Sequence, residues 1–349
     1  MKSKSILFLT IMVCCAMFTS AQQKNDTLTI IGVGDIMPGT NFPSADYLPP
    51  NKGQDIFTPL APILKNADIT IGNLEGCLLN AGGTVKKCQD TTKCYAFRIP
   101  TYFAEIIKEA GFDVVNLANN HSGDFGSIGR NSTRKTLDSV GIRYAGLNSC
   151  PSLIFEQNGL RIGFCGFSPF VGTPDILNTD TIRAVIRALD SLCDIVIVAM
   201  HAGAEGSKFT HVTKQSELFY DEDRGNVYAF AHLAVDCGAD VVLGHGPHVT
   251  RAVELYKDRF IAYSLGNFCT YARFNLKGEN GVAPLIKISV TKEGAFLKAQ
   301  VFSIKQIGEG GPLIDEAATA LQQIIALSRS DFPDGLLRID GDGTILKKP

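Results

Sequence analysis

The sequence lacks several features that would place the protein in a simple class. Its 349 residues contain no basic tract, no internal repeat and no pair of cysteines separated by two residues. Only 19% of the residues are charged and 45% are hydrophobic, which excludes disordered, collagen-like and coiled-coil proteins. The 33 Lys and Arg residues nearly balance the 35 Asp and Glu residues, for a formal charge of -2. We therefore expect no general nucleic-acid binding, which needs a cationic surface.

The amino-terminal segment has the pattern of a secretory signal peptide. Two lysines precede an apolar run at residues 6–18, and small residues follow at 19–21. An uncleaved anchor is one alternative, but a helix of this length reaches only ~20 Å, whereas the bilayer core is ~30 Å thick. A lipid anchor at Cys14 or Cys15 is the other alternative. We expect residues 1–21 to be a signal peptide, with export to the periplasm or the cell envelope.

The rest of the chain has no apolar stretch near the roughly 18 residues that a membrane-spanning helix needs, so we expect that the mature chain does not cross a membrane. In an exported protein, disulfides form readily. Three cysteines share one loop: Cys77, Cys88 and Cys94. A bridge from Cys88 to Cys94 is one pairing that fits, although the spacing does not determine the connectivity. Three others lie in or beside apolar runs, where cysteine fills the core: Cys165, Cys193 and Cys269.

Apolar runs alternate with amphipathic segments along most of the chain. The expected strands are residues 28–33, 69–71, 113–117, 161–166, 195–200, 241–243 and 260–264. The expected helices are residues 100–110, 126–140, 180–193 and 226–237. Later runs at 283–290 and 295–304 predict a hairpin, and residues 313–327 predict a final helix. This order predicts an α/β core in one domain, residues 28–330, followed by a tail at 331–349.

Polar side chains follow five of these strands, at the point where each strand ends. The residues there with metal-binding or acid–base side chains include Asp35, Glu75, Asn120, His121, His201, His245 and His248. A turn or a helix cap would explain any one of them alone. The carboxyl ends of strands in an α/β sheet share one edge, so we expect these side chains to converge on a cavity that suits a two-metal centre. His211 and His232 lie elsewhere and fit ordinary surface or core positions.

Eight short segments in a fixed order carry a family resemblance. They are residues 34–37, 73–76, 97–100, 110–113, 118–121 with Asp124 and Gly126, 201–205, 244–248 and 263–268. In this combination the chain resembles the CapA-type poly-γ-glutamate capsule-biosynthesis family from about residue 28 to residue 268. That family is similar to the calcineurin-like metallophosphoesterases. The resemblance implies an α/β fold of two packed mixed β-sheets flanked by helices, the four-layer sandwich of metallo-dependent phosphatases.

The resemblance also implies roles for individual residues. The implied metal ligands are Asp35, Glu75, Asn120, His201, His245 and His248. Among them, Asp35 and His248 would hold a first ion and Glu75 would bridge to a second. The implied catalytic residues are His121 and Glu205, with His121 as general acid or transition-state stabiliser. The residues implied to contact the substrate or to support the ligands are Asn73, Arg98, Asp124 and Asn267, and Glu205 is an alternative member of this group.

Two departures from the phosphoesterase pattern affect the metal prediction. Met37 stands where that superfamily has a ligand histidine, and a thioether is a poor ligand for hard cations. In addition, two residues separate His245 from His248, where the phosphoesterase motif has one. We therefore expect one or two divalent ions, and Mn, Zn and Fe all suit carboxylate, amide and imidazole ligands.

Three functions fit these observations. The first is an exported metal-dependent hydrolase or transferase in poly-γ-glutamate, capsule or envelope polymer biosynthesis. The second is a secreted metallophosphoesterase that acts on nucleotides or sugar phosphates. The third is a non-catalytic accessory protein that binds the polymer. The expected partners are an anionic polymer or phosphoester substrate and membrane-bound proteins of capsule synthesis.

Overall fold

The computed structural model describes residues 27–88 and 94–349, and the expected signal peptide at 1–21 lies outside them. The larger of two main sheets contains, in spatial order, β19 (Leu337–Ile339), β20 (Thr344–Lys347), β17 (Phe296–Gln306), β16 (Val282–Thr291), β1 (Thr27–Met37), β2 (Ile69–Leu74), β5 (Val114–Asn116) and β6 (Arg143–Ala145). Two further strands join it: β15 (Asn267–Thr270) pairs with β1, and β18 (Pro312–Ile314) pairs with β17. The sheet is mixed, because β1 is antiparallel to β16 and parallel to β2.

The smaller main sheet is also mixed. Its order is β13 (Val253–Tyr256), β14 (Arg259–Ala262), β12 (Val241–His245), β9 (Ile195–His201), β8 (Leu160–Phe167) and β7 (Ser152–Gln157). The strands from β14 to β8 are parallel, and the outer strands β13 and β7 are antiparallel to their neighbours. Two short ladders lie outside these sheets: β3 (Cys77–Leu78) with β4 (Arg98–Ile99), and β10 (Leu218–Phe219) with β11 (Glu222–Asp223).

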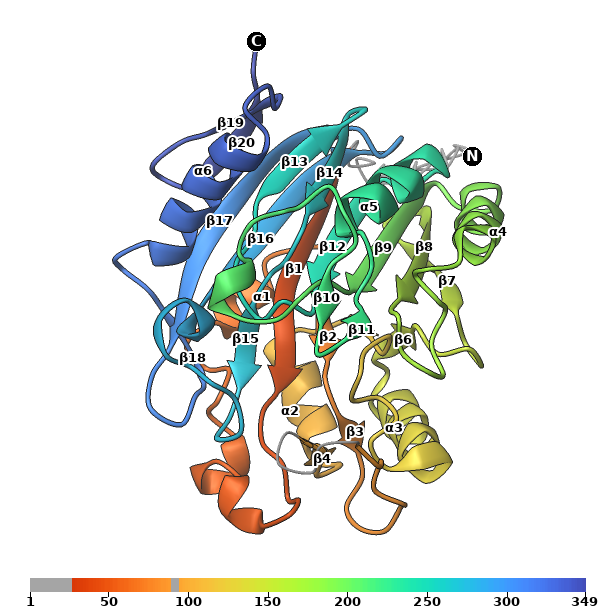
Figure 1. Ribbon diagram of the computed structural model, residues 1–349, viewed down its shortest axis with the longest axis vertical. Coiled ribbons are helices and arrows are strands. Elements are labelled where there is room, and N and C mark those ends of the chain that lie inside the picture. The colour runs from red at the N-terminus through yellow and green to blue at the C-terminus, as the bar shows by residue number, and fades with distance from the viewer. Residues whose placement is uncertain (1–26, 89–93) are drawn as a thin grey trace, which may run out of the picture.

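The two sheets pack face to face, and helices cover their outer faces (Figure 1). Side chains alternate along β1, so Ile30 joins the cluster between the sheets while Ile31 faces the helices. Helices α1 (Ala61–Leu64), α2 (Phe103–Ala110) and α3 (Gly126–Val140) cover the larger sheet, and α4 (Thr179–Asp190) and α5 (Val227–Asp236) cover the smaller. This arrangement confirms the four-layer α/β fold that the resemblance implied.

Helix α6 (Thr319–Asp331) contacts both sheets, through β16 and β17 on one side and β13 on the other. We expected a helix over residues 313–327, and its first part is wrong. Residues Pro312–Ile314 form β18 instead. The helix begins at Thr319 because Ala318 before it has a left-handed backbone that does not continue a helix. The backbone N–H of Thr319 donates to the Asp315 carboxylate at 2.9 Å.

The carboxyl-terminal segment also differs from expectation. Residues 331–349 were expected to form a tail, yet they supply β19 and β20, and Lys298 of β17 pairs with Leu346 of β20. The sheet therefore extends past residue 330, where we expected the domain to end. The apolar residues Leu337, Ile339 and Ile345 explain the difference, because they pack against the cluster between the sheets.

The cysteines follow most of the expectations. A disulfide joins Cys88 to Cys94, which confirms that pairing. Cys165 and Cys269 are buried as expected, whereas Cys193 is only half-buried. Within residues 27–88 and 94–349, none of the helices is both long enough and apolar enough to span a bilayer.

The strand register brings the predicted polar residues together at one edge. Asp35 of β1 lies beside Asn73 of β2 on one side and Asn267 of β15 on the other. In the smaller sheet, His245 of β12 lies beside His201 of β9. Each of these residues is buried, and the two rows meet where Asn73 Nδ2 lies 3.1 Å from His201 Nδ1.

Gly34 sets the close approach that places Asp35. The backbone N–H of Asp35 donates to the carbonyl oxygen of Gly266 at 2.9 Å. A Cβ atom at Gly34 would lie only 1.9 Å from that same oxygen, and a backbone carbonyl cannot move aside without breaking this bond. The position therefore requires glycine because the two chain segments pass so closely.

We predict that Gly34→Ala destabilises the fold by about 1–3 kcal/mol through overpacking. Chemical denaturation measures the change in the free energy of unfolding. Gly341→Ala is the matched control, because a Cβ there would have no atom within 4 Å. Equal stability of the two variants would contradict the close approach.

Candidate metal centre

Three side chains, from β1, from β9 and from the residue after β2, lie close enough to share one cation. Ligand atoms of Asp35, Glu75 and His201 all lie within 4.8 Å of one another, and all three residues are buried. Bonds from carboxylate oxygen and imidazole nitrogen to a divalent ion are about 2.0–2.2 Å long, so a cluster of this size suits one ion. The site therefore offers three potential ligands for one metal ion, at the edge of the sheet where the sequence predicted a metal centre.

Glu75 is the clearest sign that this cluster needs a cation. Its two carboxylate oxygens are buried and have no hydrogen-bond partner among the described residues. Burial, together with the negative charges of Asp35 and Glu205, raises the pKa of Glu75 well above its ordinary value, although His248 opposes the shift. A buried carboxylate without donors is costly in free energy, and a bound cation removes that cost.

Other buried atoms in the region also lack partners, and they are of the kinds that bind metals. Within the part of the chain that the structure describes, these atoms include His201 Nε2, His245 Nδ1 and Asn120 Oδ1. Burial lowers the pKa of His201 and of His245, which keeps both rings neutral as ligands must be. His245 Nε2 lies 3.0 Å from the Val33 carbonyl oxygen, so Nε2 donates there and the lone pair remains on Nδ1.

His248 lies among three carboxylates. Its Nδ1 donates to Asp35 Oδ2 at 2.9 Å, and its Nε2 is 3.7 Å from Glu75 Oε1 and 4.0 Å from Glu205 Oε2. Burial alone would lower the pKa of His248, but Glu75 and Asp35 raise it to about 10. Burial likewise works to raise the pKa of Asp35, and the hydrogen bond from His248 takes it below its ordinary value. In the metal-free chain an imidazolium therefore partly neutralises the cluster.

A row of asparagines holds Asp35 in place. Asn73 Nδ2 donates to Asp35 Oδ1 at 2.8 Å and lies 3.1 Å from His201 Nδ1. Asn73 Oδ1 in turn accepts hydrogen bonds from Asn116 and Asn119, both at 3.0 Å. A role for Asn73 was expected from the sequence, whereas none was expected for Asn116 and Asn119. The strand register could have identified Asn116, because Asn116 pairs with Asn73 in the adjacent strand.

His121 lies beside Glu75, at the edge of the candidate metal centre. Its Nε2 lies 3.8 Å from Glu75 Oε1, and its Nδ1 donates to Asp124 Oδ2 at 2.8 Å. Burial lowers the pKa of His121 and the Lys86 charge adds to the effect, while Asp124 opposes it. Lys86, which the sequence analysis missed, pairs with Asp124 Oδ1 at 2.6 Å. These contacts fix the imidazole so that Nε2 points towards the cluster.

The other predicted residues lie around the centre or away from it. Asn267 Nδ2 donates to the His248 carbonyl oxygen at 3.2 Å and so supports that loop. Glu205 Oε1 accepts a hydrogen bond from Arg224 at 2.7 Å. Met37 packs in the apolar cluster under the helices, so it is not a ligand. The backbone carbonyl of Asn120 accepts a hydrogen bond from Lys86, and its buried amide oxygen has no partner among the described residues. Its role as a metal ligand stays a prediction.

Arg98 lies outside the cluster of ligands. Its Nε donates to Asn41 Oδ1 at 2.6 Å, and its guanidinium lies over the rings of Phe42 and Phe125 at 5.4 and 5.3 Å. None of the described contacts of Arg98 joins it to a metal-ligating side chain. A substrate role for Arg98 therefore stays a prediction.

The fold is a two-sheet α/β sandwich, and carboxylates and imidazoles are buried together near the ends of its strands. These features define a class of proteins with a candidate divalent-metal centre. Within that class, the family model described as "Bacterial capsule synthesis protein PGA_cap" matches residues 29–272. The chain belongs to this family, which confirms the resemblance found in the sequence.

Two curated relatives and one solved structure illustrate the similarity. The chain is 30% identical over 275 residues to the capsule biosynthesis protein CapA of Bacillus anthracis, covering 70% of this chain and 60% of that protein. It is 30% identical over 263 residues to the PGA biosynthesis protein CapA of Bacillus subtilis, covering 70% of this chain and 64% of that protein. The chain thus spans less than two thirds of each relative. A purple acid phosphatase from yellow lupin aligns with a TM-score of 0.40 at 10% identity, over 86% of this chain and 55% of the phosphatase chain.

A buried ion pair supports the loop that carries Glu205. Arg251 donates to both carboxylate oxygens of Glu217, at 2.8 and 2.7 Å, and is fully buried. Glu217 Oε2 also accepts from the backbone N–H of Ala204, the residue before Glu205. The pair therefore ties the loop after β9 to the segment after β12.

We predict that Arg251→Met lowers the free energy of unfolding by about 3–5 kcal/mol, because Glu217 is left buried and unpaired. Adding Glu217→Gln to that variant should restore part of the loss, since it removes the unpaired charge. Arg338→Met, at a half-exposed position on β19, is the control and should change stability by no more than about 0.5 kcal/mol. Equal denaturation midpoints for Arg251→Met and the control would show that the buried pair has no such role.

We also predict that cation binding releases protons. His248, with its pKa raised to about 10, carries a proton at neutral pH in the metal-free chain, and a ligand imidazole must lose one. The apparent affinity for Zn or Mn should therefore rise with pH through the neutral range. Calorimetry in buffers of different ionisation enthalpy measures the released protons, and a binding heat that is the same in every buffer would contradict the prediction.

Proposed function

We propose that the protein is a metal-dependent hydrolase or transferase that acts on an anionic polymer during assembly of the capsule or cell envelope. One observation carries the proposal: among the described residues, neither oxygen of the buried Glu75 carboxylate has a hydrogen-bond donor, and the carboxylate offers a ligand atom within 4.8 Å of ligand atoms of Asp35 and His201. The names of the two Bacillus relatives, a capsule biosynthesis protein and a PGA biosynthesis protein, support the polymer as substrate. Membrane-bound synthesis proteins as partners stay a prediction.

The residues present fit one or two divalent cations. Asp35, Glu75 and His201 would hold the first, with His248 able to join once it loses its proton, and His245 offers a further free nitrogen. Such a cation supplies a Lewis acid and lowers the pKa of bound water. Mn, Zn and Fe all suit this mixture of carboxylate and imidazole.

The chain's own residues supply the proton chemistry. Asp124 accepts a hydrogen bond from His121 Nδ1 and orients the ring, so that Nε2 faces the centre, where it can hold or deliver a proton. Lys86 keeps Asp124 in position through a contact of 2.6 Å. We place His121 as the general acid, a role that requires Nε2 to take up a proton first, because the lowered pKa of His121 leaves the ring neutral. We place Glu205, near His248, as a residue that contacts the substrate.

We further propose that the protein is exported and works in the periplasm or at the cell envelope. The amino-terminal pattern of basic, apolar and small residues supports export. The Cys88–Cys94 disulfide supports it too, because disulfides persist in oxidising compartments.

We predict that Asp35→Ala and His245→Ala lose the metal and any activity together, because both residues offer ligand atoms. His121→Ala should keep the metal and lose about 10²–10⁴-fold in rate, the range that general acid–base catalysis supplies. Metal content by mass spectrometry and turnover of poly-γ-glutamate and of bis(p-nitrophenyl) phosphate measure the two effects separately.

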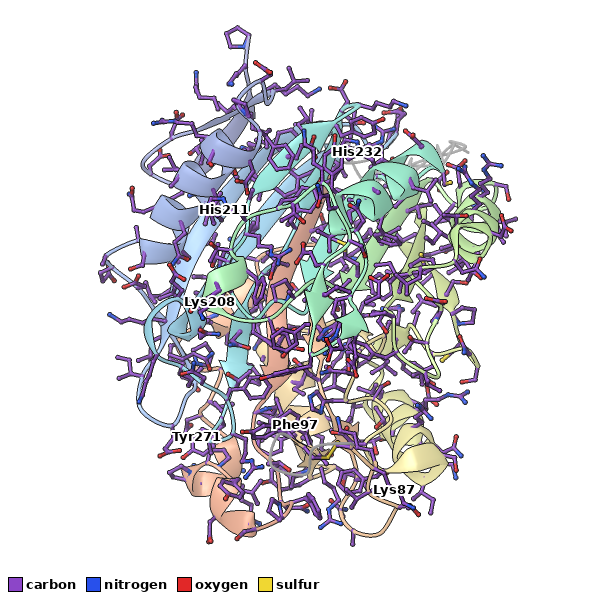
Figure 2. All side chains as sticks on the ribbon, in the orientation of Figure 1. Lys87, Phe97, Lys208, His211, His232 and Tyr271 are labelled. Carbon is purple, nitrogen blue, oxygen red and sulfur yellow. A yellow bond between two sulfur atoms is a disulfide. The ribbon has the colours of Figure 1, made fainter. Side chains whose placement is uncertain are left out.

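The control for these variants is His211→Ala, at an exposed position (Figure 2) whose ring contacts Asp331. It should change neither metal content nor rate. His121→Ala turning over as fast as the parent would refute the general-acid role. Rapid hydrolysis of the phosphodiester with no action on poly-γ-glutamate would instead favour a phosphoesterase.

A further inference from the structure

Arg273 has a guanidinium group that is held in place and yet has no anionic partner. It lies in the loop between β15 and β16, over the rings of Tyr47 at 4.7 Å and Tyr95 at 5.0 Å. No ion pair or side-chain hydrogen bond involves it among residues 27–88 and 94–349, and its Nε is buried without a partner. Two tyrosine rings thus orient the Arg273 guanidinium, and no described residue accepts a hydrogen bond from its Nε.

Protein groups accept hydrogen bonds from the guanidinium groups of several other arginines. Arg130 also has a buried Nε without a partner among the described residues, but its Nη2 donates to the Val171 carbonyl oxygen. Arg251 is bound to Glu217 at both oxygens, and Arg224 donates to Glu205 at 2.7 Å and to Glu222 at 3.1 Å. Arg98 is also stacked on aromatic rings, but its Nε donates to Asn41. In Arg273 the corresponding donor is free, and an unpaired buried donor is costly unless a ligand accepts from it.

The chain places Arg273 beside the wall of the metal centre. The next residue, Phe274, has its ring 5.5 Å from that of His248 and 5.2 Å from that of Phe97. The Phe97 ring lies 4.3 Å from the ring of His121. The aromatic wall therefore runs from His248 to His121, and Arg273 precedes its member Phe274 in the loop after β15. Figure 2 labels Phe97 of this wall and Tyr271 of this loop.

We propose that Arg273, held between Tyr47 and Tyr95, binds an oxyanion of the substrate at a subsite beside the metal centre. The proposal rests on the proposed function, because it assumes that a substrate reaches that centre. A guanidinium edge suits both carboxylate and phosphate, since each accepts two parallel hydrogen bonds from it. A substrate that reaches both the centre and Arg273 would carry an anionic group apart from the one that reacts, as a polymer of repeating carboxylates does.

Calorimetric titration of the full chain with two probes tests the subsite. The probes are a γ-linked glutamate trimer and inorganic phosphate, and the variants are Arg273→Met and Arg273→Lys. We expect Arg273→Met to weaken binding of at least one probe about tenfold, because a charge-assisted hydrogen bond is lost. Arg273→Lys should recover only part, because lysine keeps the charge but lacks the planar fork. Arg338→Met, which removes one positive charge at β19, should bind as the parent does.

The pattern of losses identifies the oxyanion. A loss for the trimer alone assigns the subsite to a carboxylate of the polymer, and a loss for phosphate alone assigns it to a phosphate group. A parent chain that binds neither probe overturns the proposal. So does an Arg273→Met variant that binds both as tightly as the parent.

Metal content and phosphodiester turnover, measured on the same preparations, separate this proposal from the proposed function. If metal content and phosphodiester turnover are normal but probe binding does not depend on Arg273, the subsite proposal alone is overturned. Binding that depends on Arg273 in a chain without metal would overturn the metal-dependent activity and keep the subsite.

Discussion

The whole site depends on a buried carboxylate that accepts no hydrogen bond from the described residues. Glu75 directly follows β2, with both oxygens buried and without a hydrogen-bond donor among residues 27–88 and 94–349, next to Asp35 and His201. Such an arrangement is unfavourable in the empty protein and becomes favourable when a cation is bound. The surrounding residues compensate the negative charge of the cluster only in part, because the His248 imidazolium and the Asn73 amide donate to Asp35.

The fold supplies the rigidity that this arrangement needs. Asp35 sits in a row with Asn73 and Asn116 because three parallel strands share a register, and His201 lies beside His245 for the same reason. The two rows belong to different sheets, whose packed inner faces keep them at a fixed separation. Strands rather than loops therefore position most of the ligand atoms, which preorganises the centre.

Much of this could be read from the sequence, and the reasons for success and failure are physical. Helix α3 was predicted to within a residue because glycines bound its regular pattern, and the converging strand ends followed from the geometry of α/β sheets. Contacts set by distant segments could not be read. Lys86 reaches Asp124 from a loop, Arg273 meets Tyr47 from far along the chain, and β20 joins the sheet through pairing that periodicity does not specify.

The most direct test of the central claim is anomalous X-ray diffraction from crystals of the protein soaked with Zn or Mn. The account predicts an anomalous peak bonded to Glu75, with Asp35 and His201 in the same coordination sphere. No peak at Glu75, or a Glu75 carboxylate hydrogen-bonded to protein or water while the ion lies elsewhere, would contradict it.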